Sequence, residues 1–162
     1  MKHINRPHLT AIARTRLSAP MQWLVDHNLI DLDRPALDYG CGLGTDAAIL
    51  GMDGYDPYHK PNTIHLDSPN RYKTITCHYV LNVLNNPGAI AYALWRIQSL
   101  LTDDGIGYVS VRADAKNLNG YTSRGTYQGD VRLNLPIVHE QSGRWRMYRL
   151  LRSNRLADIL PE

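Results

Sequence analysis

Apolar residues along the chain fall into two patterns, short continuous runs and stripes at helical spacing, and the two patterns alternate. Runs of apolar and β-branched residues bounded by turn residues predict strands at residues 36–39, 52–55, 72–79 and 106–111. Helical spacing and favourable helix starts predict helices at residues 9–15, 18–28, 45–50 and 87–101. Strands that alternate with helices are typical of an α/β fold built on a parallel sheet.

The last part of the chain has a more β-like pattern. Two stretches, 131–138 and 145–150, flank the turn residues Ser142 and Gly143, which predicts an antiparallel hairpin. A short helix is predicted at 152–159. Within the hairpin, Arg144 and Arg146 are expected to face solvent and protect a sheet edge, with a phosphate-contacting stripe as the alternative.

Tyrosine is the main aromatic residue, since the 162 residues include ten Tyr, three Trp and no Phe. Tyrosines must therefore supply most of the aromatic core, and each buried hydroxyl needs a hydrogen-bond partner. The net charge of +3 is mildly basic, so it permits a nucleic acid as partner without requiring one.

Cys41 and Cys77 are too few for a disulfide framework. Neither they nor the seven histidines show metal-ligand spacing, so no metal site is predicted. No apolar run reaches the roughly 18 residues that a membrane span requires, and residues 1–7 lack the apolar stretch of a signal peptide. These features predict a cytoplasmic protein with reduced thiols.

A glycine-rich turn follows the first predicted strand, where Asp38 is succeeded by Gly40, Gly42 and Gly44. Glycine lets the backbone approach a ligand closely and turn with positive φ. The segment Gly-Leu-Gly-Thr-Asp-Ala at 42–47 formally matches the dinucleotide fingerprint G-x-G-x-x-A. A tight strand–helix turn without any ligand is a further reading.

Three carboxylates argue against a dinucleotide. Asp38 lies beside the turn, and Asp46 lies in the first helical turn, where it would repel a pyrophosphate. Asp56 follows Gly42 by fourteen positions, whereas a dinucleotide site places its acidic residue about twenty residues on. S-adenosylmethionine has no phosphate and carries a cationic sulfonium and amino group. Asp38 can face that cationic part, and Asp56 can accept both ribose hydroxyls.

The ordered motifs resemble class I S-adenosylmethionine-dependent methyltransferases over about residues 36–112. Asp-Tyr-Gly-Cys-Gly-Leu-Gly is similar to their first motif, and Gly-Tyr-Asp-Pro-Tyr is similar to the acidic end of their second strand. Methyltransferases found with DNA phosphorothioation systems show a closer likeness, which extends to Tyr-Val-Leu-Asn-Val at 79–83. The resemblance implies a Rossmann-like, doubly wound, mostly parallel sheet with an antiparallel C-terminal hairpin.

The sequence departs from that family in being compact. Eleven residues separate Gly44 from Asp56, which shortens the first helix. Residues 57–70 are rich in Pro, Asn, His and Asp and predict a loop with one brief strand at 63–66, so the second helix and third strand are reduced. Asp67 in this loop is a candidate for the adenine amino group, with a solvated loop aspartate as the alternative.

The resemblance and the positions of the strand ends together define the candidate site. Its predicted cofactor-binding residues are Asp38, Tyr39, Gly40, Cys41, Gly42, Gly44, Asp56, Pro57, Asp67, Cys77 and His78. His78 is the candidate base, since its ordinary pKa is near neutrality, while Tyr79 and Arg112 are expected to border the acceptor. Cys41 and Cys77 are expected to pack as small apolar groups rather than to act as nucleophiles.

These observations predict one domain over residues 1–162, with a helical cap at 1–34, a cofactor-binding core at 36–112 and a substrate-side region at 113–162. The predicted activity is methyl transfer from S-adenosylmethionine to an unidentified acceptor, either a small molecule or a partner-delivered target. The alternatives are a non-catalytic or degenerate S-adenosylmethionine-binding domain in a complex, and an NAD-dependent oxidoreductase. The loop 113–130 is expected to be a substrate lid or simply a long loop.

Overall fold

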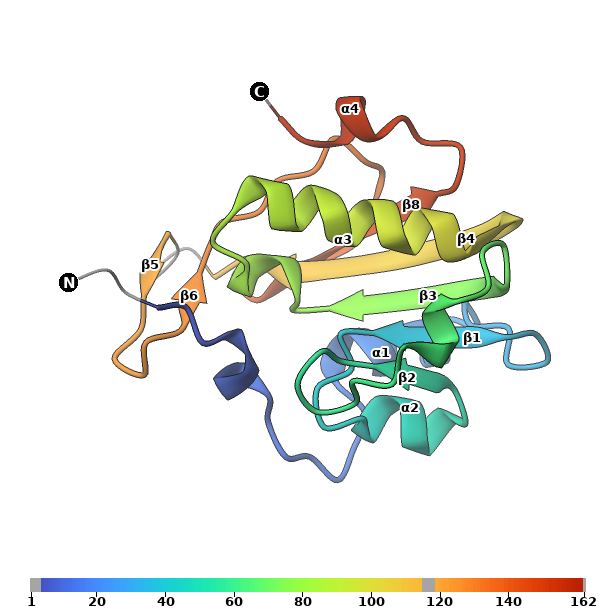
Figure 1. Cartoon of the computed structure of the whole chain (residues 1–162), viewed down its shortest axis with the longest axis horizontal. Helices are drawn as coiled ribbons and strands as arrows, with labels where there is room; N and C mark the ends of the chain where they lie inside the picture. Colours follow the sequence, from blue (N-terminus) through green and yellow to red (C-terminus); the bar gives the residue numbers. More distant parts are fainter. Residues whose placement is uncertain (1–3, 115–118, 162) are drawn as a thin grey trace.

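A six-stranded sheet forms the centre of the computed structural model, which describes residues 4–114 and 119–161 (Figure 1). The strand order is β2-β1-β3-β4-β8-β7. The strands are β1 Ala36–Tyr39, β2 Asp53–Tyr55, β3 Tyr72–His78, β4 Leu101–Arg112, β7 Ile137–Gln141 and β8 Trp145–Leu151. The first four are parallel, and β8 runs antiparallel to both β4 and β7. The predicted mostly parallel Rossmann-like sheet with its antiparallel hairpin is thereby confirmed.

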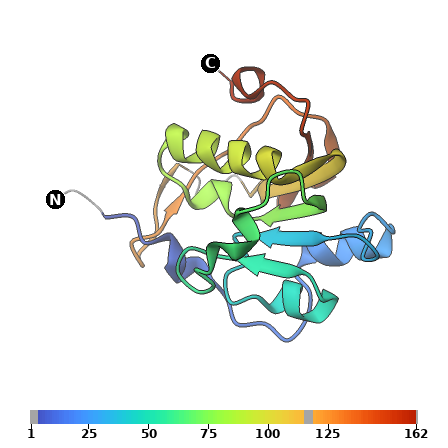
Figure 2. The same cartoon turned by 45° about the vertical axis from the view of Figure 1, so that its right-hand side comes forward.

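Helices pack on both faces of this sheet, and each face has its own apolar cluster (Figure 2). On one face α3 (Pro87–Leu100) and α4 (Leu156–Ile159) cover a cluster that contains Leu94 and Ile97. On the other face α1 (Ala19–Asp26) and α2 (Thr45–Leu50) cover a second cluster. Burial of these two faces fixes the register of the strands, because a slip by one residue would exchange their sides.

Local sequence signals account for the best-defined elements. The Asn86 side chain accepts a hydrogen bond from the Gly88 N–H at 2.7 Å and caps α3, and Pro87 occupies its first turn. The chain then enters β4 at Leu101, five residues before the predicted start of that strand at residue 106. Asp103 and Asp104 are exposed, so the sheet extends past the polar stretch at no cost of burying a charge.

Several short predicted elements are wrong in kind or length. The helix predicted at 9–15 is a 3-10 turn, η1 (Pro7–Thr10), and the strand predicted at 63–66 is a 3-10 turn, η2 (Thr63–Leu66). The first hairpin strand begins at Ile137 rather than 131, and the last helix at Leu156 rather than 152. Segments this short carry too little periodicity to distinguish a turn from a strand.

The loop 113–130 contains a small antiparallel pair, β5 (Gly120–Tyr121) and β6 (Tyr127–Gln128), while its residues 115–118 lie outside the described part. Between β2 and β3, η2 is the one helical or strand segment, so β2 forms an edge of the sheet. This agrees with the predicted reduction of the second helix and third strand. Within residues 4–114 and 119–161, no helix has the length and apolar character to cross a membrane.

Candidate functional site

A cavity of about 750 Å³ opens where the parallel strands β1 to β4 end at their carboxyl edge. This edge is where α/β sheets place their ligands, and the volume falls in the range of about 300–1,000 Å³ usual for small-molecule sites. Its walls come from the loop after β1, the tip of β2, the segment after β3, the end of β4 and the N-terminal segment.

The loop after β1 brings backbone to the cavity wall. Gly40 has φ +77°, and a Cβ at this residue would lie 2.3 Å from the Val80 Cγ2 atom. Only glycine satisfies both the left-handed conformation and this close approach. The amide groups of Gly40 and Cys41 both donate to the Tyr55 carbonyl oxygen, at 2.7 and 2.9 Å, and fix the loop against β2.

Asp38, in β1 just before this loop, is not among the residues of the cavity wall. Its side chain is buried, and its Oδ1 accepts a hydrogen bond from the Thr76 hydroxyl at 2.8 Å. Burial raises the pKa of the Asp38 carboxyl to about 7, and nearby Asp46 adds to the rise, while the Thr76 hydrogen bond opposes it. The expected contact of Asp38 with a cationic ligand stays a prediction, and within the described residues its carboxylate is hydrogen-bonded to Thr76 of β3.

Asp56 does line the cavity, at the tip of β2. Its Oδ1 accepts hydrogen bonds from the N–H groups of Tyr58 and His59, both at 2.9 Å, and its Oδ2 accepts one from the Gly42 N–H at 3.2 Å. The carboxylate thus ties the second strand tip to the glycine loop. One lone pair of Oδ2 stays available for a ligand hydroxyl, since each carboxylate oxygen accepts two bonds.

Residues 5–18 form a strap along the cavity, which Figure 1 shows on the carboxyl-end side of the sheet before α1 begins. At its start Asn5 Nδ2 donates to the Val83 carbonyl oxygen at 2.7 Å, and its Oδ1 accepts from the Tyr127 N–H at 3.1 Å. In its middle the His8 ring stacks on Tyr58 with ring centroids 4.4 Å apart. Sequence analysis missed the strap, because its contacts join residues far apart in the chain.

The far end of the strap is held by Asp46, in the first turn of α2. Its carboxylate accepts bonds from the Ser18 N–H at 2.8 Å and the Ser18 hydroxyl at 2.6 Å, and Arg14 Nη2 lies 3.5 Å away. Ser18 stands at the N-cap position of α1, as predicted, but its hydroxyl binds Asp46 instead of capping that helix. The buried Asp46 charge is therefore used to dock the strap.

We expect Asp46→Ala to lower the free energy of unfolding by about 1–3 kcal/mol, because it leaves the buried Ser18 N–H and hydroxyl without an acceptor. Urea unfolding followed by fluorescence measures the change. Asp26→Ala is the matched control, since Asp26 accepts an exposed bond from Gln22 and should change stability by less than about 0.5 kcal/mol. Equal losses in the two variants would contradict the proposed docking.

The end of β3 places His78 and Tyr79 in the cavity wall. The His78 Nδ1 atom makes a short hydrogen bond with the Ser110 hydroxyl, and burial lowers the pKa of the imidazole to about 4, so it is neutral at pH 7. Tyr79 has φ +59°, a conformation that non-glycine residues seldom adopt, and its N–H donates to the Ser110 carbonyl oxygen at 2.8 Å. This turn aims the chain after β3 over the cavity.

Among the described residues, three buried polar side-chain atoms lack a hydrogen-bond partner: His8 Nδ1, His78 Nε2 and Asn82 Oδ1. All three residues line the same cavity. A buried polar atom without a partner is costly, so its presence calls for a ligand or an ordered water. All three therefore belong to one part of the structure in which polar groups are left for a ligand or ordered water to satisfy.

Arg112, at the end of β4, also lines the cavity. Its guanidinium makes a bidentate ion pair with Asp114, in which Nε lies 2.8 Å from Oδ1. Arg144 lines the same end of the cavity from just before β8. Arg144 is exposed, as expected, but the expectation for Arg146 is wrong, because Arg146 is buried and paired with Glu140 at 2.7 Å, and β8 is an interior strand.

The structure thus brings most predicted site residues to one cavity. Those in its wall are Tyr39, Gly40, Cys41, Gly42, Asp56, Pro57, His78, Tyr79 and Arg112. The predicted residues outside its wall are Asp38, Gly44, Asp67 and Cys77. Asp67 is exposed after η2, in the part of the β2–β3 connection that lies away from the cavity, and Cys77 is fully buried in the core within β3.

The two thiols are poor nucleophiles in these surroundings. Burial raises the pKa of the Cys41 thiol to about 12, and burial also raises that of the Cys77 thiol. A thiol with a raised pKa stays protonated at neutral pH and is unreactive. In the part of the chain that the structure describes, no group of three or more His, Cys, Asp or Glu could hold a metal ion.

Comparison with known proteins identifies the fold. No protein-family model matches the chain, and no curated protein matches it. Among solved structures, it is similar to a magnesium protoporphyrin IX methyltransferase from Synechocystis PCC 6803, with TM-score 0.50 and 16% identity over 83% of this chain and 81% of that one. That protein was solved with bound SAH.

Two further structures give the same result. A SAM-dependent methyltransferase from Thermotoga maritima has TM-score 0.51 and 11% identity over 82% of this chain and 94% of that one. A TehB-like SAM-dependent methyltransferase from Corynebacterium glutamicum has TM-score 0.50 and 18% identity over 81% of this chain and 86% of that one. With its strand order and the cavity at the carboxyl edge, the chain has the Rossmann-like fold of S-adenosylmethionine-dependent methyltransferases.

Proposed function

We propose that this chain binds S-adenosylmethionine in the cavity and transfers its methyl group to an acceptor bound beside it. The observation that carries the proposal is the placement of three unpartnered buried polar atoms around one cavity that the glycine loop and Asp56 border. The fold of the similar structures agrees with it. The likeness to methyltransferases of DNA phosphorothioation systems, like the cytoplasmic location, stays a prediction from the sequence.

The residues present fit this cofactor. The glycine loop offers backbone without side chains, and Asp56 Oδ2 offers an acceptor for the ribose hydroxyls. Tyr55 and Tyr92 supply aromatic surface for the adenine ring. Arg14, on the strap, is the cation available to the carboxylate of the methionine part. Asp38, whose carboxylate accepts a hydrogen bond from Thr76, ties β1 to β3 and acts as a positioning residue.

When bound, the cofactor supplies an electrophilic methyl group on a sulfonium. The protein then has to hold the acceptor in line with that group and exclude water, and proximity of this kind contributes several kcal/mol. The neutral His78 imidazole, with its Nε2 atom unpartnered, can accept a proton from an acceptor that must lose one. Its lowered pKa makes it a weak base, so positioning is the larger contribution.

Calorimetry with S-adenosylhomocysteine tests the proposal. We expect binding to the folded protein, weakened about tenfold to a hundredfold by Asp56→Ala, because a charge-assisted hydrogen bond to the ribose contributes about 1.5–3 kcal/mol. Asp67→Ala is the matched control and should bind like the native chain, since Asp67 is exposed outside the cavity.

Two other outcomes separate the alternatives. Absence of heat from S-adenosylhomocysteine, together with binding of NAD⁺, would replace the proposal by a nicotinamide-dependent oxidoreductase. Binding without methylation of nucleic-acid, protein and small-molecule acceptors would favour a non-catalytic cofactor-binding domain. The folded state of each sample is checked by circular dichroism.

A further inference from the structure

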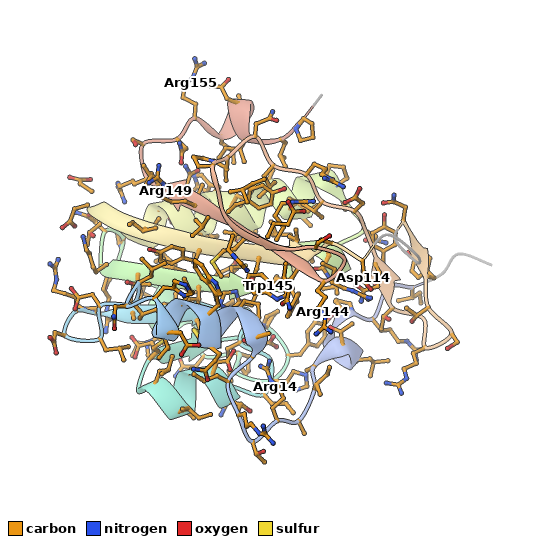
Figure 3. The ribbon with its side chains drawn as sticks, turned by 180° about the vertical axis from the view of Figure 1, so that it is seen from behind. Arg14, Asp114, Arg144, Trp145, Arg149 and Arg155 are labelled. Atoms are coloured by element: carbon orange, nitrogen blue, oxygen red, sulfur yellow. The ribbon has the colours of Figure 1, made fainter. Side chains whose placement is uncertain are left out.

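Two arginines, Arg112 at the end of β4 and Arg144 just before β8, line the end of the cavity where the sheet changes from parallel to antiparallel. Arg112 ends β4 and pairs in register with Trp145, and the Ala113 N–H donates to the Arg144 carbonyl oxygen at 3.0 Å. Figure 3 shows Arg144 beside Asp114 at this end of β8, with Arg14 on the strap below them. Arg149 and Arg155 lie toward the opposite end of the strand.

The charges at this end of the cavity do not balance. Asp114 neutralises the charge of Arg112 through its bidentate ion pair. The Arg144 guanidinium is exposed, and within residues 4–114 and 119–161 it has no ion pair or hydrogen bond. The other carboxylate of the cavity wall, Asp56, is already held by three backbone N–H groups. One full positive charge is therefore left for a ligand.

Of the two arginines, Arg112 lies on the side of the proposed reaction, and Arg144 lines the same cavity. Side chains two residues apart on a strand lie on the same face, about 7 Å apart, so Arg112 projects on the side of Ser110. The Ser110 hydroxyl contacts His78, whose Nε2 atom is buried without a partner in the cavity wall. A ligand anchored at the arginines would thus extend toward His78.

We propose that the methyl acceptor is a small molecule with a carboxylate or phosphate group, which Arg144 and Arg112 bind at this end of the cavity. This inference rests on the proposed function, since it names the acceptor of the same site. Guanidinium groups match the planar geometry of carboxylates and the oxygens of phosphates. In the bound state, the anion pairs with Arg144 and shares Arg112 with Asp114.

The surroundings favour a single anion over a nucleic acid. A nucleic acid is held by several phosphate contacts along a basic stripe. Here the next arginine along β8, Arg146, is 4% exposed and paired with Glu140, so it does not extend the charge. The phosphate-contacting stripe considered from the sequence is therefore interrupted after Arg144.

Three probes of similar shape test the inference on protein saturated with S-adenosylhomocysteine: benzoate, phenyl phosphate and the neutral benzamide. By calorimetry, we expect at least one anion to bind at least about tenfold more tightly than benzamide, and more weakly as salt is raised. Arg144→Gln should remove most of that preference. Arg149→Gln is the matched control and should keep it, since Arg149 is an exposed arginine of β8 outside the cavity wall.

Three outcomes would overturn the inference. The first is no preference for either anion over benzamide while S-adenosylhomocysteine still binds, which rejects the anionic acceptor and leaves the proposed function intact. The second is equal loss of preference in Arg149→Gln. The third is a short single-stranded DNA that binds more tightly than both anions and depends on Arg144. If S-adenosylhomocysteine itself fails to bind, the proposed function is wrong, and the probes are compared on the protein alone, where absence of a charge preference rejects the anion site.

Discussion

Gly40→Ala is expected to lower the free energy of unfolding by about 2–5 kcal/mol and to abolish detectable binding of S-adenosylhomocysteine. The residue has φ +77°, where a side chain is strained, and the new Cβ would lie 2.3 Å from Val80 Cγ2. Valine is stiff at χ1, so relief requires movement of the chain after β3 or of the glycine loop. Either movement displaces a wall of the cavity. Urea unfolding and calorimetry measure the two losses.

Two further variants distinguish the backbone strain at positive φ from the steric clash of the new Cβ with Val80. Gly51→Ala shares the positive φ, +67°, but its Cβ would meet nothing within 4 Å, so only about 1–2 kcal/mol of stability should be lost. Adding Val80→Ala to Gly40→Ala should restore part of the stability, because it removes the atoms that collide. If Gly51→Ala and Gly40→Ala were equally destabilising, the close approach to Val80 would have no energetic role.

Two buried groups at the strand ends should give the protein an unusual dependence of stability on pH. The pKa of Asp38 is raised to about 7 in the folded state. Its contribution to the free energy of unfolding is therefore present at low pH and is lost as pH rises from 3.8 to about 7. The pKa of His78 is lowered to about 4, so its contribution is present above 6.5 and is lost as pH falls to about 4. Between about pH 4 and 6.5 both groups titrate, and their effects on the free energy of unfolding have opposite signs. Together they leave the free energy of unfolding nearly constant over this range.

Single substitutions should expose each slope. In Asp38→Asn, stability is expected to rise by about 3 kcal/mol between pH 4 and 6.5, as His78 alone titrates. In His78→Gln, stability is expected to fall by about 4 kcal/mol between pH 4 and 7, as Asp38 alone titrates. Urea unfolding at closely spaced pH values measures both. Slopes of the same sign in the two variants would mean that one of the two groups is not buried as described.

Much of the fold could be predicted where a local signal fixes an element. The strand Ala36–Tyr39 and the helix Thr45–Leu50 have the predicted limits, because a short apolar run ends at glycines that start a helix. The start of α3 follows from Asn86 and Pro87. By contrast, the extension of β4 to Leu101 and the position of β8 inside the sheet depend on pairing with distant strands. Local propensity carries no information about such pairing.

The residues of the candidate site also differ in whether the sequence alone could predict them. The glycine loop, Asp56 and the residues after β3 could be located, since parallel strands end at one edge. The strap could not, because it is held along the cavity by the contacts of Asn5, His8 and Arg14 with the distant residues Tyr127, Tyr58 and Asp46. The unpartnered atom of Asn82 was also missed, because a missing partner is a property of the packed structure alone.

By itself, the sequence determined the α/β class, the glycine turn beside two acidic residues and the compact connection between the second and third strands. These features follow from short-range chemistry: apolar periodicity, the conformational freedom of glycine and the residues that begin a helix. Only the tertiary structure decided that Asp38 is buried against Thr76 while Asp56 borders the cavity, and that Arg144 is exposed with no ion pair to any residue the structure describes while Arg146 is buried. The reason is that burial and pairing depend on which distant segments the fold brings together, and they set the charge and pKa of each side chain.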